Sequence, residues 1–258
     1  MAKNILLSIS YDGTDFCGWQ RQDEQRSVQG ELEAALQKLF GQKINLQGSG
    51  RTDSGVHAKA QAANFLCPVD SIPDQNIPRA LNNFLPRDVR VNEARSVDQD
   101  FSARFSATSR VYRYFILPKQ IPSAAFSRYV WPINHQPDIK NLNDMASVLR
   151  GELDCKTFAG AGDASLSTKR YIDNAFFFEE EDSFGQKKIV FEIEANAFLY
   201  RMVRSLTGTF IDFDKNKKGA ADFKKSLEAC DRSEAGPTAP PDGLFLWQVK
   251  FDGVRRHV

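Results

Sequence analysis

The segment from Gly48 to His57 reads Gly-Ser-Gly-Arg-Thr-Asp-Ser-Gly-Val-His and holds the residues best suited to chemistry. Three glycines surround one arginine and one aspartate, and glycine lets other groups approach the backbone closely. The carboxylate of Asp53, two residues from the guanidinium of Arg51, is typical of a reactive group held in place by a turn. The alternative is a tight turn closed by an Asx hydrogen bond, which the local sequence taken alone favours.

Arginines gather in three further stretches of the chain. These are Arg21 with Arg26, Arg104 with Arg110 and Arg113, and Arg201 with Arg204. Guanidinium groups bind phosphate in a bidentate manner and stack on bases, so such stretches could contact RNA. The formal net charge is only +1, so any attraction to RNA must come from local patches. Taken one by one, the arginines are better explained as salt-bridge partners on solvated faces.

Length and composition are those of an ordinary soluble protein. With 258 residues, 41% hydrophobic and 26% charged, the chain can form one large domain or two smaller ones. Neither a membrane span of about 20 apolar residues nor a signal peptide is expected. The four cysteines, Cys17, Cys67, Cys155 and Cys230, are far apart. We therefore expect neither a disulfide framework nor a zinc site, and a reducing cytoplasm is the expected location.

Two of the histidines invite a chemical role that the surrounding sequence does not support. His57 follows Asp53 by four residues, and we expect it to be a hydrogen-bonded scaffold residue or an RNA contact. His135 has no acidic or cysteine partner nearby in the sequence, so a metal site there is not expected.

Apolar periodicity predicts an α/β chain built from two tandem halves. The first half is predicted to contain strands at 3–10, 45–49, 60–67 and 89–96 and helices at 28–40 and 75–84. The second is predicted to contain strands at 111–117, 175–178, 189–193 and 244–251 and helices at 139–149, 200–213 and 222–230. We place the halves at residues 1–105 and 106–258, with the boundary near 98–109. We expect a cleft between them, because ligands usually bind in such clefts.

Six blocks, in order along nearly the whole chain, carry a family resemblance. They are Tyr11-Asp12-Gly13; Phe16–Gln22; Gly50–Ala58; Phe105-Ser106-Ala107 with Arg110–Tyr114; Asn196–Leu199 with Met202-Val203-Arg204; and Ala235–Leu244. Together they resemble the tRNA pseudouridine synthase A family. The resemblance implies two pseudo-symmetric, RRM-like α/β halves that share a largely antiparallel sheet with a central cleft, and it implies a homodimer.

The same resemblance implies an activity. It is that of an isomerase which converts uridine to pseudouridine at positions 38–40 of the tRNA anticodon stem-loop. The N-glycosidic bond breaks, the uracil turns, and the base is rejoined through carbon, so neither a cofactor nor a metal is required.

Residue by residue, the resemblance assigns Asp53 as the catalytic aspartate and Arg204 as its basic partner. A nearby cation keeps a carboxylate ionised in a desolvated site. Tyr112 matches the active-site tyrosine, whose ring can stack on uracil and whose hydroxyl could carry the proton that leaves C5. Tyr114 lies on the same strand face, and we expect it to pack.

The arginines follow in the same way. Arg51 matches the residue expected to fill or brace the space left by the extruded uridine. Arg21, Arg104 and Arg110 are expected to contact phosphates, because RNA of this kind is read mostly through shape and backbone.

Two alternatives to this activity require different residues. The first is a catalytically inactive RNA-binding module of the same fold, which would have been free to lose Asp53, Tyr112 or Arg204; the chain has all three. The second is a glycosidase-type hydrolase, which needs a second carboxylate placed with Asp53, and no block supplies one.

Overall fold

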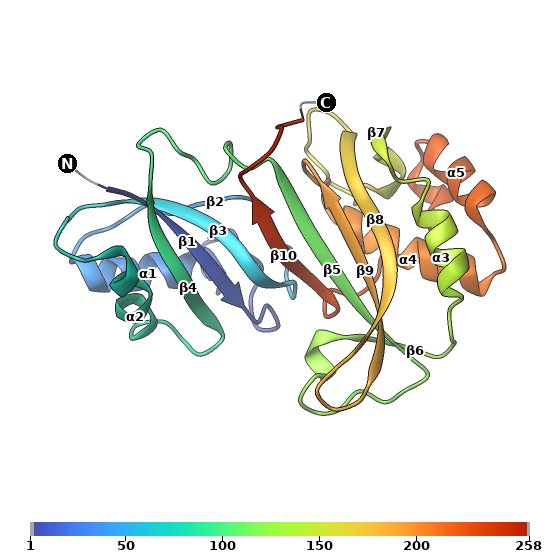
Figure 1. Ribbon diagram of the computed structural model, residues 1–258, viewed down its shortest axis with the longest axis horizontal. Helices are drawn as coiled ribbons and strands as arrows, with labels where there is room; N and C mark the ends of the chain where they lie inside the picture. The colour runs from blue at the N-terminus through green and yellow to red at the C-terminus, as the bar shows by residue number, and fades with distance from the viewer. Residues whose placement is uncertain (1–2, 257–258) are drawn as a thin grey trace. The chain divides into compact units, whose positions relative to one another are not determined.

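The computed structural model describes residues 3–256, and the chain divides into two compact α/β units (Figure 1). The first unit runs up to Thr108 and takes in Phe245–Gly253, while the second comprises Ser109–Leu244 and a short C-terminal segment. The boundary is close to the one expected at residues 105 and 106. The C-terminal strand, however, belongs to the first unit, because it pairs there. Across the described residues, no helix is long and apolar enough to cross a membrane.

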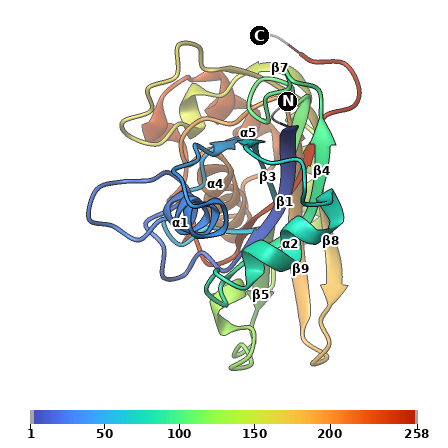
Figure 2. The ribbon, with the colours of Figure 1, turned by 90° about the vertical axis from the view of Figure 1, so that its left-hand side faces the viewer.

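The first unit follows the predicted β-α-β-β-α-β order and adds the C-terminal strand. Its elements are β1 (Lys3–Tyr11), α1 (Val28–Phe40), β2 (Gln47–Gly48), β3 (His57–Cys67), α2 (Ile77–Asn82), β4 (Val89–Val97) and β10 (Leu244–Lys250). Strands β4, β1 and β3 are antiparallel neighbours, β2 pairs with β3, and β10 joins β3 in parallel. Helix α1 lies to one side of these strands (Figure 2).

The core of the first unit follows from the alternation of β1. Ile5, Leu7 and Ile9 point to one face and are fully buried. Phe40 of α1 contacts Phe65 of β3, with ring centroids 6.0 Å apart, so the helix packs against the strands. On the opposite face a smaller apolar cluster forms. Its members are Leu6, Ala62 and Ala103, with Val97, Phe101, Val249 and Phe251 packed around them.

Helix α1 begins and ends where its sequence predicts. The Ser27 hydroxyl caps the amino end by accepting a hydrogen bond from the Gly30 amide at 3.3 Å. Gly41 ends the helix with φ of 72°, a left-handed conformation that glycine adopts without strain. The helix is therefore held at both ends by local interactions, before any tertiary contact is added.

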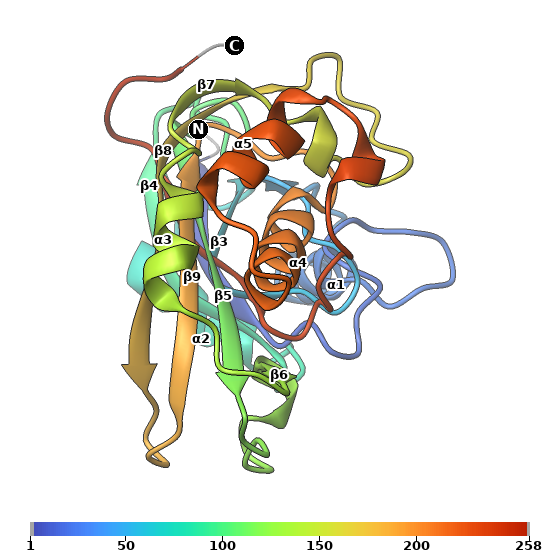
Figure 3. The ribbon, with the colours of Figure 1, turned by 90° about the vertical axis from the view of Figure 1, so that its right-hand side faces the viewer.

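The second unit is also α/β, with a largely antiparallel sheet. Its elements are β5 (Ser109–Pro118), β6 (Trp131–Ile133), α3 (Ile139–Ala146), β7 (Gly151–Asp154), β8 (Lys169–Glu181), β9 (Lys187–Ala195), α4 (Met202–Lys215) and α5 (Ala220–Glu228). Strands β5, β9, β8 and β7 are antiparallel neighbours, and β6 pairs with β5 in parallel. Helices α3, α4 and α5 of this unit are labelled in Figure 3.

Contacts between aromatic rings join the helices of this unit to its strands. Phe210 of α4 contacts both Phe177 of β8 and Phe191 of β9, each with ring centroids 5.2 Å apart. Phe223 of α5 stacks on Phe210 at 4.5 Å and on Phe158 at 5.5 Å. Helix α4 is thus fixed on the strands by its apolar side, and α5 is fixed on α4.

The prediction of two α/β halves with mainly antiparallel strands is confirmed. The largest differences concern β2, β6, β7 and β8. The strand predicted at 45–49 shortens to β2, β8 is much longer than its predicted 175–178, and β6 and β7 were not predicted. The length of β8 comes from its antiparallel partner β9, and β7 forms as a short edge strand on β8. The central cleft between the halves stays a prediction.

Candidate active site

Asp53 lies in the loop between β2 and β3. Two glycines in the segment between β1 and α1, Gly13 and Gly18, let the backbone of that segment pack closely against this loop. A Cβ added to Gly18 would lie 2.6 Å from the carbonyl oxygen of Thr52, and one added to Gly13 would overlap the carbonyl of Val56. Gly18 also has φ of 113°. Any larger residue at either position would therefore push the Asp53 loop away.

Hydrogen bonds then fix the backbone of this loop. The Trp19 amide donates to the Thr52 carbonyl at 3.1 Å, and the hydroxyls of Tyr11 and Thr52 are 2.8 Å apart. The turn itself is closed by the Val56 amide, which donates to the Asp53 carbonyl at 3.2 Å. Asp53 is half-buried. The carboxylate is thus carried on a fixed backbone and is still reachable.

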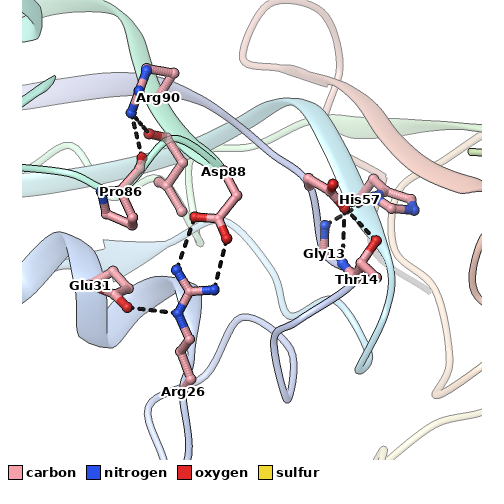
Figure 4. Close-up of polar contacts among 10 residues, drawn as sticks. Gly13, Thr14, Arg26, Glu31, His57, Pro86, Asp88 and Arg90 are labelled. Carbon is pink, nitrogen blue, oxygen red and sulfur yellow. Dashed lines mark hydrogen bonds and ion pairs between the residues drawn. The ribbon is translucent and has the colours of Figure 1, made fainter. Parts of the chain in front are cut away.

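His57 is part of the scaffold of this loop. Its side chain is buried, its Nδ1 accepts a hydrogen bond from the Gly13 amide at 2.9 Å (Figure 4), and its ring stacks on Phe245 at 4.6 Å. These contacts agree with the scaffold interpretation of the sequence.

Arg26 also serves the structure. Its two terminal nitrogens donate to the Asp88 carboxylate at 2.7 and 2.9 Å, and its Nε donates to Glu31 at 2.9 Å (Figure 4). The guanidinium lies 4.1 Å from the centroid of the Phe16 ring. The hydrogen bond with Asp88 raises the pKa of Arg26. The segment that supports the Asp53 loop is thereby tied to the start of β4.

The arginines expected to contact RNA differ in their exposure and in the partners that their guanidinium groups contact within the protein. Arg51 is exposed, and its Nε donates to Gln20 Oε1 at 3.0 Å. Arg21 forms an ion pair with Glu33 at 2.7 Å. Arg104 is exposed, with its guanidinium 5.4 Å from the Phe105 ring centroid.

In the second unit, the two tyrosines of β5 have different surroundings. Tyr112 is half-buried and meets Phe198 edge-on at 5.0 Å. Tyr114 is fully buried, and its hydroxyl donates to the Pro240 carbonyl at 2.6 Å. Burial raises the pKa of Tyr114 well above its usual value, Arg204 opposes the rise and Asp242 adds to it. Tyr114 is therefore a packing and anchoring residue, while Tyr112 is reachable.

Arg204 is held in the first turn of α4 by the loop that precedes β10. Its Nε donates to the Ala239 carbonyl at 2.9 Å, and the Ala239 amide donates back to the Arg204 carbonyl at 3.0 Å. Gly208, one turn further on, gives this loop room, because a Cβ there would lie 2.9 Å from the Pro237 carbonyl carbon.

Arg110, at the start of β5, donates to the Asn196 carbonyl at 2.7 Å.

The predicted site residues thus fall into two groups. Arg51 and Asp53 share one loop of the first unit, and the backbone amide of Arg21 is linked to Arg51 through the side chains of Gln29 and Gln20. Tyr112 and Arg204 belong to the second unit. Sequence reasoning missed Gln20 as the partner of Arg51, although Gln20 stands within the Phe16–Gln22 block that carries the resemblance.

Comparison with known proteins identifies the class to which this fold and loop belong. The family described as tRNA pseudouridine synthase matches residues 7–106 and 145–252, which span both units. The chain therefore belongs to the tRNA pseudouridine synthase family, whose members are isomerases.

Individual relatives are similar in sequence to this chain over most of their length. The tRNA pseudouridine synthase A of Treponema denticola is 52% identical over 254 residues, covering 96% of this chain and 93% of the relative. That of Treponema pallidum is 47% identical and covers 91% of this chain and 84% of the relative. That of Caldicellulosiruptor bescii is 39% identical, and the match covers 96% of this chain and 100% of the relative.

Proposed function

We propose that this protein converts uridine to pseudouridine in tRNA, at positions 38–40 of the anticodon stem-loop, as a cytoplasmic homodimer. Family membership supports the reaction and the tRNA substrate. The position in the tRNA, the dimer and the location rest on the resemblance of the sequence blocks. The observation that carries the proposal is the carboxylate of Asp53 on a loop fixed by Gly13 and Gly18.

The reaction conserves the atoms of the nucleotide. The N1–C1′ bond of uridine breaks and a C5–C1′ bond forms, while C5 loses a proton and N1 gains one. An ionised carboxylate at Asp53 can act as the nucleophile that bridges these steps. The base must leave its stack before the carboxylate can reach it.

The other residues receive supporting roles. Arg204 serves as the cation that keeps the carboxylate ionised, and its orientation is limited by the hydrogen bond to Ala239. Tyr112 stacks on the uracil, and its hydroxyl carries the proton from C5.

RNA binding is assigned to four arginines. Arg51 braces the space left by the extruded base, and Arg21, Arg104 and Arg110 contact phosphates. Arg21 must exchange its ion pair with Glu33 for a phosphate, which is inexpensive because its side chain is 63% exposed.

The test replaces Asp53 with asparagine, which keeps the size of the side chain and removes the charge. Each protein is incubated with unmodified tRNA, pseudouridine is mapped by position, and the Kd for tRNA is measured separately. Asp23→Asn is the matched control, because it removes the same charge from an exposed position of the same unit.

We expect the wild type and Asp23→Asn to modify positions 38–40. We expect Asp53→Asn to bind tRNA with unchanged affinity and to form no pseudouridine. Wild-type turnover by Asp53→Asn would refute the assigned role of the carboxylate. A wild-type protein that binds tRNA without modifying it would instead be the inactive binding module.

A further inference from the structure

A chain of three polar side chains leads from Arg51 to helix α1. Arg51 Nε donates to Gln20 Oε1 at 3.0 Å, and Gln20 Nε2 donates to Gln29 Oε1 at 2.6 Å. Gln29 Nε2 in turn donates to Glu33 Oε1 at 3.1 Å. All three are half-buried, and we call Gln20, Gln29 and Glu33 the α1 relay.

The partners of Gln29 determine which atoms donate and which accept along the α1 relay. Gln29 Nε2 faces the Leu46 carbonyl at 3.0 Å and the Glu33 carboxylate, and both groups only accept hydrogen bonds. The amide oxygen of Gln29 must therefore face outward, where it also accepts from the Arg21 amide at 3.1 Å. Gln20 then has to direct its NH₂ group at Gln29 and its oxygen at Arg51. No other assignment of the two amides satisfies these partners.

The relay therefore holds the guanidinium of Arg51 at its Nε edge. Its Nε is engaged by Gln20, and across residues 3–256 the structure gives its two terminal nitrogens no hydrogen bond or ion pair. Both terminal nitrogens of Arg26, in contrast, bind Asp88. The guanidinium is planar, so fixing Nε limits the plane in which the other two nitrogens lie. Such a fork, two residues from Asp53, suits a phosphate oxygen pair.

We propose that Gln20 is a positioning residue, which acts through Arg51: it holds the guanidinium so that its terminal nitrogens brace the space left by the extruded base by binding the backbone phosphate beside it. This inference rests on the proposed function for the identity of the RNA. Loss of the hydrogen bond between Arg51 and Gln20 should weaken the phosphate contact about tenfold, which corresponds to about 1.4 kcal/mol.

The experiment is a double-mutant cycle with Gln20→Leu and Arg51→Ala. Each variant is measured for the Kd of unmodified tRNA and for kcat/KM of pseudouridine formation. Leucine resembles glutamine in size but cannot accept from Arg51. Gln25→Leu is the matched control, since Gln25 is exposed in the same segment. Thermal unfolding shows whether each variant is folded.

We expect Gln20→Leu to raise the Kd and lower kcat/KM about tenfold when Arg51 is present, and less than twofold in the Arg51→Ala background. Gln25→Leu should behave as the wild type. Equal losses in both backgrounds, or no loss with Gln20→Leu, would overturn the proposal. The cycle in Kd decides this even if the wild type forms no pseudouridine, an outcome that would count against the proposed function alone.

Discussion

The contact between Gly208 and the loop before β10 yields a prediction in which two opposing effects compete. Alanine favours a helix over glycine by about 1 kcal/mol, so Gly208→Ala should stabilise α4 if helix propensity decided the outcome. A Cβ at this position would, however, lie 2.9 Å from the Pro237 carbonyl carbon and 3.0 Å from the Ala239 amide nitrogen. These are backbone atoms, which cannot rotate away, so the loop must move.

Moving the loop breaks identifiable hydrogen bonds. They are the two between Arg204 and Ala239 and the one from the Gly236 amide to Thr209 Oγ1 at 3.0 Å. At about 1 kcal/mol of net stability for each bond, their loss outweighs the gain in propensity. We therefore expect Gly208→Ala to lower the free energy of unfolding by about 2 kcal/mol.

The assay is urea unfolding followed by circular dichroism, together with kcat/KM on unmodified tRNA. Activity should fall about tenfold or more, because the Ala239 carbonyl that orients Arg204 is displaced. Gly30→Ala in α1 is the control, since its Cβ would meet only the Ser27 hydroxyl at 3.0 Å. Its stability should change by less than about 1 kcal/mol. A Gly208→Ala protein that is as stable and as active as the wild type would refute this reasoning.

Two further predictions concern stability. Tyr114→Phe removes the hydroxyl that donates to Pro240, and we expect a loss of about 1–3 kcal/mol at neutral pH by urea unfolding. Because burial raises the pKa of Tyr114, the unfolded chain releases this proton first, so the wild type should lose stability as pH rises above about 10, and Tyr114→Phe should lose less. A steeper alkaline loss in the variant would contradict this. Arg26→Gln removes the ion pairs with Asp88 and Glu31, which are partly exposed, and should cost about 1 kcal/mol in low salt and less in high salt. Unfolding midpoints at two salt concentrations measure this, and a cost that is independent of salt would argue against an electrostatic origin.

Local sequence determined much of the secondary structure. Helix α1 was predicted with its observed bounds, because its apolar spacing and the Ser27 cap are local signals that lie within or next to the helix. Strand β1 was predicted to within one residue, because its alternation records which face is buried. The full length of β8 was not predictable, since the pairing with β9 extends it into residues such as Glu180 and Glu181.

The candidate site divides in the same way. The sequence by itself identified the Asp53 loop, since its glycines, its charges and its family resemblance all lie within ten consecutive residues. It also named Tyr112 and Tyr114 as lying on one strand face, but their alternation is identical. The family resemblance distinguished them in the sequence, and only the tertiary structure supplies the physical reason, because burial depends on what packs opposite, and Pro240 is distant in sequence from Tyr114.

The relay behind Arg51 was likewise decided by tertiary structure alone. Gln20 and Arg51 are 31 positions apart, and a glutamine leaves no periodic signature in a sequence. Hydrogen bonds form between whichever groups the fold brings within about 3 Å, so their partners appear only once the chain is folded. The sequence determined which groups are present and which loop carries the carboxylate; the fold decided which side chains hold Arg51, Tyr114 and Arg204 in place.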